Sequence, residues 1–255
     1  MDNSSREQRI FSVVMKAGEL LLGNGAEIFR VEETMVRIAN AYGLDKMEVF
    51  IIANGIFATA DADGQDLFAK IKHIPPRGAH LGRVAAVNDL SRKIEQGKLS
   101  VEDAEKRLAE IGEIPEYSKA QQIMGAGLGS ACFSVLFGGT LYDGAVACVL
   151  GILLYIFVLI CIKHGFTKML YHVLACALAS LGAVLCVRIG LGNQIDKVII
   201  GAIIPLVPGV AFTTAIRDIS NSDYLSGMVR MMDALLIAMS MAIGVGIITQ
   251  FYSII

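Results

Sequence analysis

The second half of this chain has very little charge. Of the 46 Asp, Glu, Lys and Arg side chains in 255 residues, 35 lie in residues 1–119 and 11 in residues 120–255. An apolar segment of about 20 residues is costly to leave in water and is long enough to cross a hydrocarbon core of about 30 Å. This scarcity of charge disfavours a large soluble helical core and predicts two unlike parts, one soluble and one in lipid.

The chain also lacks a surplus of positive charge. Its formal net charge is −2, and it has no basic cluster, so the electrostatic basis for binding nucleic acid is missing. It has no nucleophile with a base at hydrogen-bonding spacing, no glycine-rich phosphate loop and no metal motif. We therefore expect neither an enzyme nor ATP-driven transport, and we expect no cofactor and no metal.

Cysteines at metal-ligand spacing are absent as well. The five cysteines lie within apolar stretches, without a CxxC pair, and are typical of small packing residues. The segment DADG, residues 61–64, begins like a calcium loop, but Lys72 stands where the bidentate Glu is required. We interpret it as a hairpin turn.

Five apolar stretches occupy the second half, and each is long enough to cross a bilayer. They predict an α-helical polytopic membrane domain of about five transmembrane helices over residues 119–255. The predicted spans are residues 121–139, 144–162, 169–191, 198–216 and 231–252.

Basic residues indicate how the spans are oriented. Lys163 and Lys168 lie between the second and third spans, and Arg217 and Arg230 lie between the fourth and fifth. Cytoplasmic loops carry an excess of Lys and Arg, so these loops are predicted to face the cytoplasm. The first 20 residues lack a continuous apolar run, and we expect no cleaved signal peptide. The expected arrangement in the membrane is a cytoplasmic amino terminus and an external carboxyl terminus.

The charged first part predicts a cytoplasmic α+β domain over residues 1–118. Apolar residues recur at helical spacing in residues 6–23 and 28–42, which predicts a helix hairpin. Three short runs rich in β-branched and aromatic residues follow and predict a three-stranded meander. Two further helices are predicted over residues 80–96 and 101–111, the second opened by Ser100 with Asp103 three residues later.

The fourth predicted span contains the most informative pattern, PLVPGVAFTTAIRD, residues 205–218. Pro205, Pro208 and Gly209 are unfavourable in one continuous helix, because each proline removes a backbone donor. Irregular backbone at membrane depth survives only inside protein or beside a watery cavity, and transporters use it to hold polar solutes. We predict a broken span with Thr213 and Thr214 as added hydroxyls; the alternative is a proline kink used only for packing.

Charged residues flank the predicted mouth of the fourth and fifth spans. With one polar amide, the group consists of Arg217, Asp218, Asn221, Asp223, Arg230 and Asp233, and the alternative is that they are simply solvated. An ionisable group at the start of a span usually faces a pathway or a partner charge, which draws attention to Asp233. Arg230 is its nearest candidate partner in the sequence.

In the soluble part, Glu27, Arg30, Glu33 and Arg37 are separated by three or four residues. Opposite charges at this spacing support a helix, which is the simpler interpretation. The alternative is that Glu27 and Arg30, beside the helix break at Asn24, form a fixed polar site or a gate against the membrane domain.

Two separated motifs resemble the threonine/serine exporter family. They are GELLLGNGAEIFRVEETMVRIANAYGL with EVFIIANGIFATA, and PLVPGVAFTTAIRD with SGMVRMMDALLIA. The resemblance implies a cytoplasmic amino-terminal domain, membrane helices and secondary export of small solutes. Those solutes are typically threonine and serine, or a dicarboxylate such as succinate in bacterial two-component members. The matching positions are Gly25, Glu27, Arg30, Glu32, Pro208, Gly209, Arg217, Asp218, Arg230 and Asp233.

The chain departs from single-chain members of that family, which continue with a second, similar membrane half. The resemblance to split members implies a second small polytopic membrane subunit or self-association. The other expected partners are a small polar solute (an amino acid or dicarboxylate), a coupling proton or ion, and membrane lipid. A different class of function also stays open, in which the α+β domain binds a ligand and the protein is a membrane-anchored sensor or regulatory subunit.

Overall fold

The computed structural model describes residues 3–44, 46–62, 66–74 and 78–254. The chain divides into two compact units. Unit 1 comprises Met1–Glu116 and Val210–Met231, and unit 2 comprises Tyr117–Gly209 and Met232–Ile255. The sequence did not indicate that residues 210–231 group with the amino-terminal residues. The division at residue 118 into a cytoplasmic and a transmembrane domain stays a prediction, because the two units are defined by contacts within the chain and not by a membrane.

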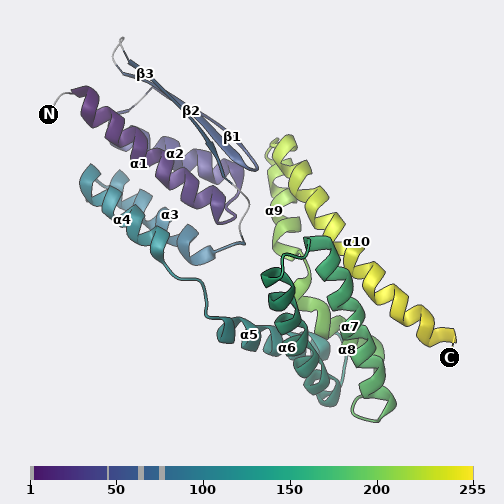
Figure 1. Cartoon of the computed structure of the whole chain (residues 1–255). Coiled ribbons are helices and arrows are strands. Elements are labelled where there is room, and N and C mark those ends of the chain that lie inside the picture. The colour runs from purple at the N-terminus through teal and green to yellow at the C-terminus, as the bar shows by residue number, and fades with distance from the viewer. Residues whose placement is uncertain (1–2, 45, 63–65, 75–77, 255) are drawn as a thin grey trace. The chain divides into compact units, whose positions relative to one another are not determined.

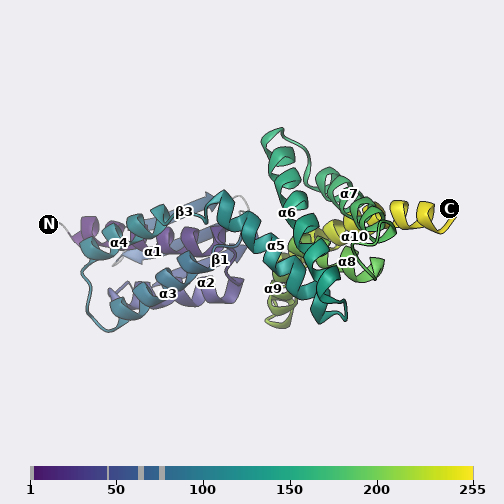
Figure 2. The ribbon, with the colours of Figure 1, turned by 90° about the horizontal axis from the view of Figure 1, so that it is seen from below.

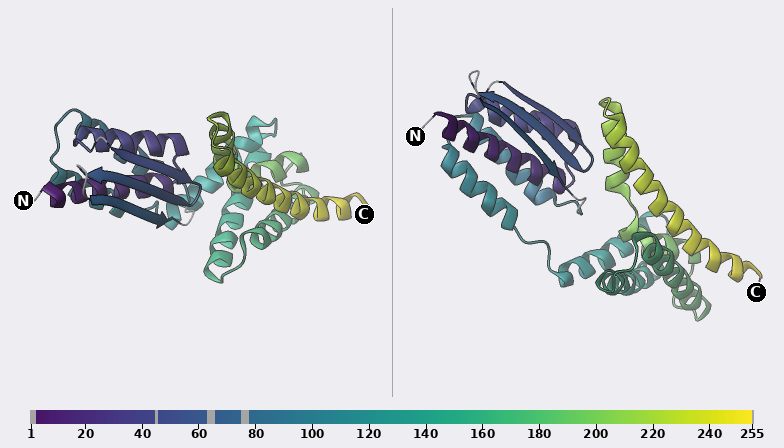
Figure 3. Two further views of the ribbon diagram at one scale, coloured as in Figure 1. Left: turned by 90° about the horizontal axis from the view of Figure 1, so that it is seen from above. Right: turned by 45° about the horizontal axis from the view of Figure 1, so that its top comes forward.

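The amino-terminal part of unit 1 has three layers (Figure 1). An antiparallel sheet of order β1-β2-β3 covers α1 and α2, and α3 and α4 pack on the opposite side of these two helices (Figure 3). The predicted helix hairpin, meander and helix pair are confirmed. The elements are α1 (Asn3–Gly23), α2 (Ile28–Ala41), β1 (Met47–Ile52), β2 (Gly55–Ala62), β3 (Asp66–His73), α3 (Leu81–Glu95) and α4 (Val101–Glu113).

Local sequence explains where these elements begin and end. After α2, Gly43 adopts φ +82°, a conformation that glycine reaches without steric cost. Ser100 begins α4 as predicted, because its hydroxyl accepts a hydrogen bond from the Asp103 N–H at 3.1 Å. The predicted turn in DADG includes residues 63 and 64, which lie outside the described residues.

The core of unit 1 lies between its layers. Val14 of α1, Met35 of α2, Ile56 of β2, Ile94 of α3 and Leu108 of α4 are each at most 2% exposed. Burying one such side chain contributes about 1.5–3 kcal/mol. The sheet and both helix pairs are therefore held together by one continuous apolar cluster.

Unit 2 is helical, and its helices group closely (Figure 2). Small residues permit this approach: a Cβ on Gly201 would lie 2.6 Å from the Ser134 Cβ, which is too close for any side chain. Helix α10 begins in unit 1 and continues into unit 2 after Met231. The elements are α5 (Lys119–Leu136), α6 (Leu141–Lys163), α7 (Lys168–Arg188), α8 (Ile195–Ile203), η1 (Ile204–Leu206), α9 (Gly209–Ser220, in unit 1 from Val210) and α10 (Tyr224–Ile254).

The structure does not confirm five spans. Among the described residues, α6, α7 and α10 are long and apolar enough to cross a membrane, and a fourth span is added only if α8–η1 and α9 are counted as one broken span. Helix α5 does not qualify, since Lys119, Gln121 and Gln122 lie in its first turn. The protein is thus a mostly helical membrane protein with three or four candidate spans and a small α+β part.

The predicted break in the fourth span is confirmed. Helix α8 ends at Ile203, the short helix η1 contains Pro205, and α9 begins only at Gly209, after Pro208. At 1.5–2 Å per residue, α8 and η1 together reach about 20 Å, which is short of a hydrocarbon core of about 30 Å. Residues 198–216 are therefore not one continuous spanning helix.

Candidate functional site

The turn between α1 and α2 in unit 1 positions Glu27. Asn24 ends α1 by donating from Nδ2 to the Leu20 carbonyl oxygen at 2.7 Å. Gly25 adopts φ +85°, and a Cβ there would lie 3.2 Å from the Ala79 Cβ, so this position requires glycine. Glu27 is the N-cap residue of α2, but its side chain does not cap its own helix. The carboxylate is therefore available for other partners.

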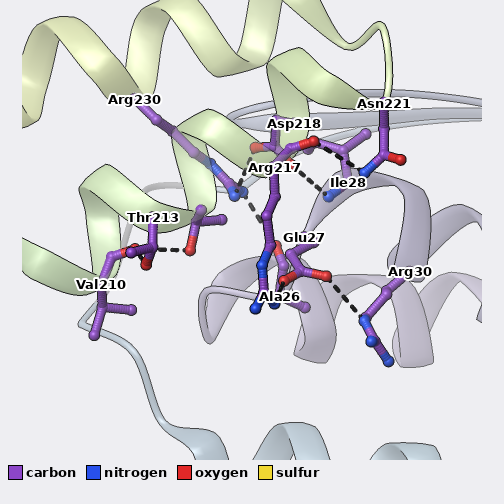
Figure 4. Close-up of polar contacts among 11 residues, drawn as sticks. Ala26, Glu27, Ile28, Arg30, Val210, Thr213, Arg217, Asp218, Asn221 and Arg230 are labelled. Atoms are coloured by element: carbon purple, nitrogen blue, oxygen red, sulfur yellow. Dashed lines mark hydrogen bonds and ion pairs between the residues drawn. The ribbon is translucent and has the colours of Figure 1, made fainter.

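Two guanidinium groups bind the Glu27 carboxylate (Figure 4). Arg30 Nε donates to Oε2 at 2.9 Å, and Arg217 Nη1 of α9 donates to Oε1. Burial alone would raise the pKa of Glu27, but the hydrogen bonds from Arg217 and Arg30 outweigh burial and hold the pKa below its usual value. Glu27 is consequently ionised in this arrangement.

Asp218 of α9 binds the same turn from within unit 1. It is fully buried, and its Oδ1 accepts a hydrogen bond from the Ile28 N–H at 3.2 Å. Ile28 is the first residue of α2, so Asp218 supplies the capping oxygen that Glu27 does not. A negative charge at a helix amino terminus is also favoured by the helix dipole.

Arg230 of α10 is the partner charge of Asp218. Its Nη1 lies 3.0 Å from Asp218 Oδ2, an ion pair without the alignment of a hydrogen bond, and its Nη2 donates to the Ala26 carbonyl oxygen at 3.2 Å. The Arg230 side chain is 16% exposed. We call Glu27, Arg217, Asp218 and Arg230 the clamp, because they join the α1–α2 turn to α9 and the start of α10.

The connection between α9 and α10 brings the clamp residues together. Ser222 in the turn adopts φ +71°, and Gly227 lies against the preceding helix. A Cβ on Gly227 would lie 2.9 Å from the Ile219 backbone nitrogen and 3.0 Å from the Ala215 carbonyl oxygen. Only glycine permits this approach, which places Arg230 of α10 beside Asp218 of α9.

A pocket of about 300 Å³ lies beside the clamp, within unit 1. This volume is at the lower end for small-molecule sites. The hydroxyls of Thr213 and Thr214 donate to the Val210 carbonyl oxygen at 3.0 and 2.8 Å, and both residues line the pocket. Within the described part of the chain, no three Asp, Glu, His or Cys side chains group as metal ligands. The polar lining residues are Glu27, Arg30, Asn88, Thr213, Thr214 and Arg217.

A second polar network, formed by residues at the start of α3, contacts the α1–α2 turn. Arg83 of α3 donates from Nη1 to Asn24 Oδ1 at 3.3 Å, and from Nη2 to the Ile114 carbonyl oxygen at 2.6 Å. His80 accepts from the Arg83 N–H at its Nδ1 and lies 3.3 Å from the Pro115 carbonyl oxygen at its Nε2. The turn that carries Glu27 is thereby tied to α3 and to the residues that follow α4.

The structure divides the residues that the sequence analysis proposed. Thr213, Thr214, Arg217 and Asp218 lie in unit 1 with the proposed gate residues, and both Glu27 and Arg30 take part in the site. Arg30 also forms the predicted helix-supporting pair with Glu27, as Arg37 does with Glu33. The remaining proposed pathway residues belong to unit 2: Pro205, Pro208, Gly209 and Asp233.

One pairing expected from the sequence is wrong. Asp233 pairs with Lys168 of α7, with Nζ and Oδ2 at 2.7 Å, and Arg230 pairs with Asp218. Arg230 and Asp233 lie almost one helical turn apart on α10, but each side chain finds an opposite charge on another helix. Proximity in sequence was a poor guide, because three-residue spacing permits a pair but does not exclude a better tertiary partner.

Sequence reasoning missed Arg83, Asn88 and the pairing of Lys168 with Asp233. It also missed Asp143, whose carboxylate accepts hydrogen bonds from the Thr140 N–H and hydroxyl at the start of α6. Only Asp143 had a readable signal, since Thr140 three residues earlier completes a capping-box pattern. Arg83 contacts Asn24 and Lys168 contacts Asp233, each far away in sequence, and no local pattern marks either of them or Asn88.

The apolar helices and the broken helix pair are those of a membrane protein, and the family that matches the chain is one of transporters. A family model described as putative threonine/serine exporter matches residues 12–252. The chain belongs to this threonine/serine exporter family.

The relatives fall into two groups by their names. The chain is 26% identical to proteins named probable succinate transporter subunit YjjP from Klebsiella aerogenes and Escherichia coli K12, over 95% of this chain and 94% of each relative. It is 22% identical to a probable threonine/serine exporter of Mycobacterium tuberculosis, over 93% of this chain but 45% of that protein. No solved structure matches the chain. The names point to transporters and not to enzymes.

Proposed function

We propose that this chain is a subunit of a secondary exporter in a bacterial inner membrane, and that a second small membrane subunit completes it. The observation that carries the proposal is the charged pocket of unit 1, in a chain whose family members are named as exporters. The proposed solutes are small polar metabolites, either threonine and serine or a dicarboxylate such as succinate. The relatives named as subunits support a two-part assembly, because the chain matches them over nearly their whole length.

The proposal assigns two groups of residues. Thr213, Thr214, Arg217 and Asp218, with Pro205, Pro208, Gly209 and Asp233, contribute to the solute pathway, and Glu27, Arg30 and Arg230 act as a cytoplasmic gate or in coupling to a proton or ion. The freed backbone carbonyls around Pro205 and Pro208 supply acceptors that a continuous helix lacks. The amino terminus is proposed to be cytoplasmic and the carboxyl terminus external.

Flux through proteoliposomes tests this function. The chain is reconstituted alone and with a candidate second subunit, and the movement of labelled succinate, threonine and serine is followed. We expect flux of one solute class, and we expect Pro208→Leu and Asp218→Asn to reduce it at unchanged protein abundance. Asp196→Asn is the matched control, because Asp196 is a surface carboxylate that pairs with its neighbour Lys197. Unchanged flux in both test variants would show that the site assignment is wrong.

One observation favours a second function, that of a membrane-anchored ligand sensor or regulatory subunit. The pocket is formed wholly within unit 1, so a ligand can bind there without any contribution from unit 2. A pure sensor binds ligand but gives no flux in any combination of subunits. The proteoliposome measurement therefore separates the two functions.

A further inference from the structure

We infer that the unit 1 pocket binds a small organic dicarboxylate on Arg217 and Arg30, and that this ligand displaces Glu27 from Arg217 and so opens one half of the clamp. The inference deepens the proposed function by naming the residues that hold the solute and the contact that its binding breaks. It rests on that function only for the statement that the ligand is transported.

The first step is the unused binding capacity of the two arginines. A guanidinium group has five N–H donors in a planar fork that matches a carboxylate. Among the described residues, Glu27 takes up one N–H of Arg217 and one of Arg30. The two side chains are 64% and 55% exposed and both line the pocket. Each can therefore bind a carboxylate that enters from outside.

The second step is the position of Glu27 between them. Its two carboxylate oxygens are divided between the two guanidinium groups, one oxygen to each (Figure 4). The Glu27 side chain is only 11% exposed, so an incoming carboxylate meets a pocket that already contains a carboxylate. Two carboxylates held by the same guanidinium groups repel each other, so an incoming carboxylate competes with Glu27 for Arg217 and Arg30.

The third step is charge balance. With Glu27 in place, the three charged lining groups sum to one positive charge, whereas the two guanidinium groups alone carry two. A dicarboxylate neutralises both when Glu27 withdraws, but a zwitterionic amino acid does not. Electrostatic complementarity of this kind selects between ligands of similar size.

The fourth step is that the clamp can open in part. Asp218 and Arg230 hold the α1–α2 turn through backbone atoms of Ile28 and Ala26, and neither contact involves Glu27. The turn thus stays attached when the Glu27–Arg217 contact breaks. Because Arg217 is mostly exposed, its guanidinium group stays solvated when the contact with Glu27 breaks.

Equilibrium binding of radiolabelled succinate and L-threonine to the purified full chain in detergent tests the inference. Removing the competing internal carboxylate with Glu27→Gln is expected to tighten succinate binding about fivefold. Arg217→Gln is expected to weaken it at least about tenfold, because charge-assisted hydrogen bonds are lost. Threonine binding is not expected to tighten in Glu27→Gln, since its ammonium group loses a counter-charge.

The matched controls are Glu33→Gln and Arg37→Gln, which disrupt a Glu–Arg pair on the same helix but outside the pocket. Both are expected to bind succinate as the parent does. Glu27→Asp is a second test should Glu27→Gln fold poorly, because the shorter carboxylate cannot bridge both arginines, and succinate binding should again tighten. A folded Glu27 variant with unchanged or weaker succinate affinity overturns the inference, and so does a parent chain that binds no succinate.

The binding measurement tests the inference, and the flux measurement tests the exporter function, so the two claims can fail independently. Tighter succinate binding by Glu27→Gln without flux in proteoliposomes keeps the inference and removes the exporter function in favour of a sensor. Flux of a solute without the predicted change in affinity keeps the exporter function and removes the inference.

Discussion

Two fully buried aspartates, one in each unit, are stabilised in different ways. In unit 2, Asp143 of α6 accepts hydrogen bonds from the Thr140 N–H and hydroxyl at 2.8 and 2.7 Å, and from the Asn193 and Gln194 N–H groups at 2.6 and 3.0 Å. In unit 1, Asp218 accepts one backbone hydrogen bond and pairs with Arg230. Neutral donors alone hold the first carboxylate, whereas one backbone donor and one charge hold the second.

This difference separates a structural carboxylate from one suited to function. The donors of Asp143 are mostly backbone groups, which cannot leave without unfolding the ends of α6 and α8. The stability of Asp218 depends on Arg230, a long side chain on another helix. Buried ion pairs rarely add stability over apolar residues, but losing one partner is costly. Any motion that withdraws Arg230 therefore destabilises the buried Asp218 carboxylate.

The largest effect is expected when Arg230 is removed. Arg230→Met leaves the Asp218 carboxylate buried without a counter-charge, so the free energy of unfolding should fall by about 3–5 kcal/mol. Thermal unfolding of the purified chain in detergent measures this. Lys168→Met is the control, because it breaks an ion pair whose side chains are about half exposed and should cost about 0–1 kcal/mol.

A double variant tests the explanation. Asp218→Leu combined with Arg230→Met removes both charges and should recover much of the lost stability. Equal losses in the single and double variants would show that packing, and not the uncompensated charge, explains the effect.

A smaller but clear loss is expected at Asp143. Asp143→Ala leaves the Asn193 and Gln194 N–H groups without their acceptor and removes the cap of α6, which should cost about 2–4 kcal/mol. The same thermal measurement applies. Asp143→Asn retains one acceptor oxygen and should lose less. If Asp143→Ala unfolds at the temperature of the parent, the four hydrogen bonds do not stabilise unit 2.

A local cap in unit 1 gives a reference for these values. Ser100→Ala removes the oxygen that binds the Asp103 N–H at the start of α4, and the expected loss is about 1 kcal/mol. Ser100→Asp retains an acceptor and should leave the unfolding temperature nearly unchanged. A loss as large as that of Asp143→Ala would mean that this cap also supports contacts beyond α4.

The smallest effect concerns pH and the exposed half of the clamp. The pKa of Glu27 lies below its value of 4.5 in the unfolded chain, so its contribution to stability is present above pH 4.5 and is lost as pH falls through the lower, folded pKa. The contribution should be below about 1 kcal/mol, because Arg217 and Arg30 are mostly exposed. Unfolding temperatures of the parent and Glu27→Gln should differ at pH 7 and converge in acid. A difference that grows as the pH falls contradicts the lowered pKa.

Local patterns in the sequence predicted most of the fold. The spacing of Val31, Met35 and Ile38 predicted the buried face of α2, Ser100 with Asp103 predicted the start of α4, and Pro205 with Pro208 predicted the break after α8. The predicted number of spans was less successful. Composition made residues 121–139 look like a membrane helix, but the polar first turn of α5 keeps it below the hydropathy of the other spans.

The candidate site was predicted only as separate residues. Glu27 and Arg30 were recognised as a pair, and Arg217 and Asp218 as charges near a helix break, but nothing in the sequence linked the two groups. The Ile28 N–H and Asp218 Oδ1 that join them are 190 residues apart. Contacts over such a separation depend on how the helices pack, and periodicity within a helix carries no information about it.

The sequence by itself determined the helices, the meander, the break at the prolines and the segregation of charge, because these follow from interactions within a few residues and from the cost of exposing apolar surface. Only the tertiary structure decided that Asp218 caps α2, that Arg230 pairs with Asp218 while Asp233 pairs with Lys168, and that Glu27 lies between two arginines beside a pocket. Each of these contacts depends on a balance between the free-energy cost of desolvating a charge and the favourable interaction with the partners that packing brings near it. That balance exists only in the folded chain.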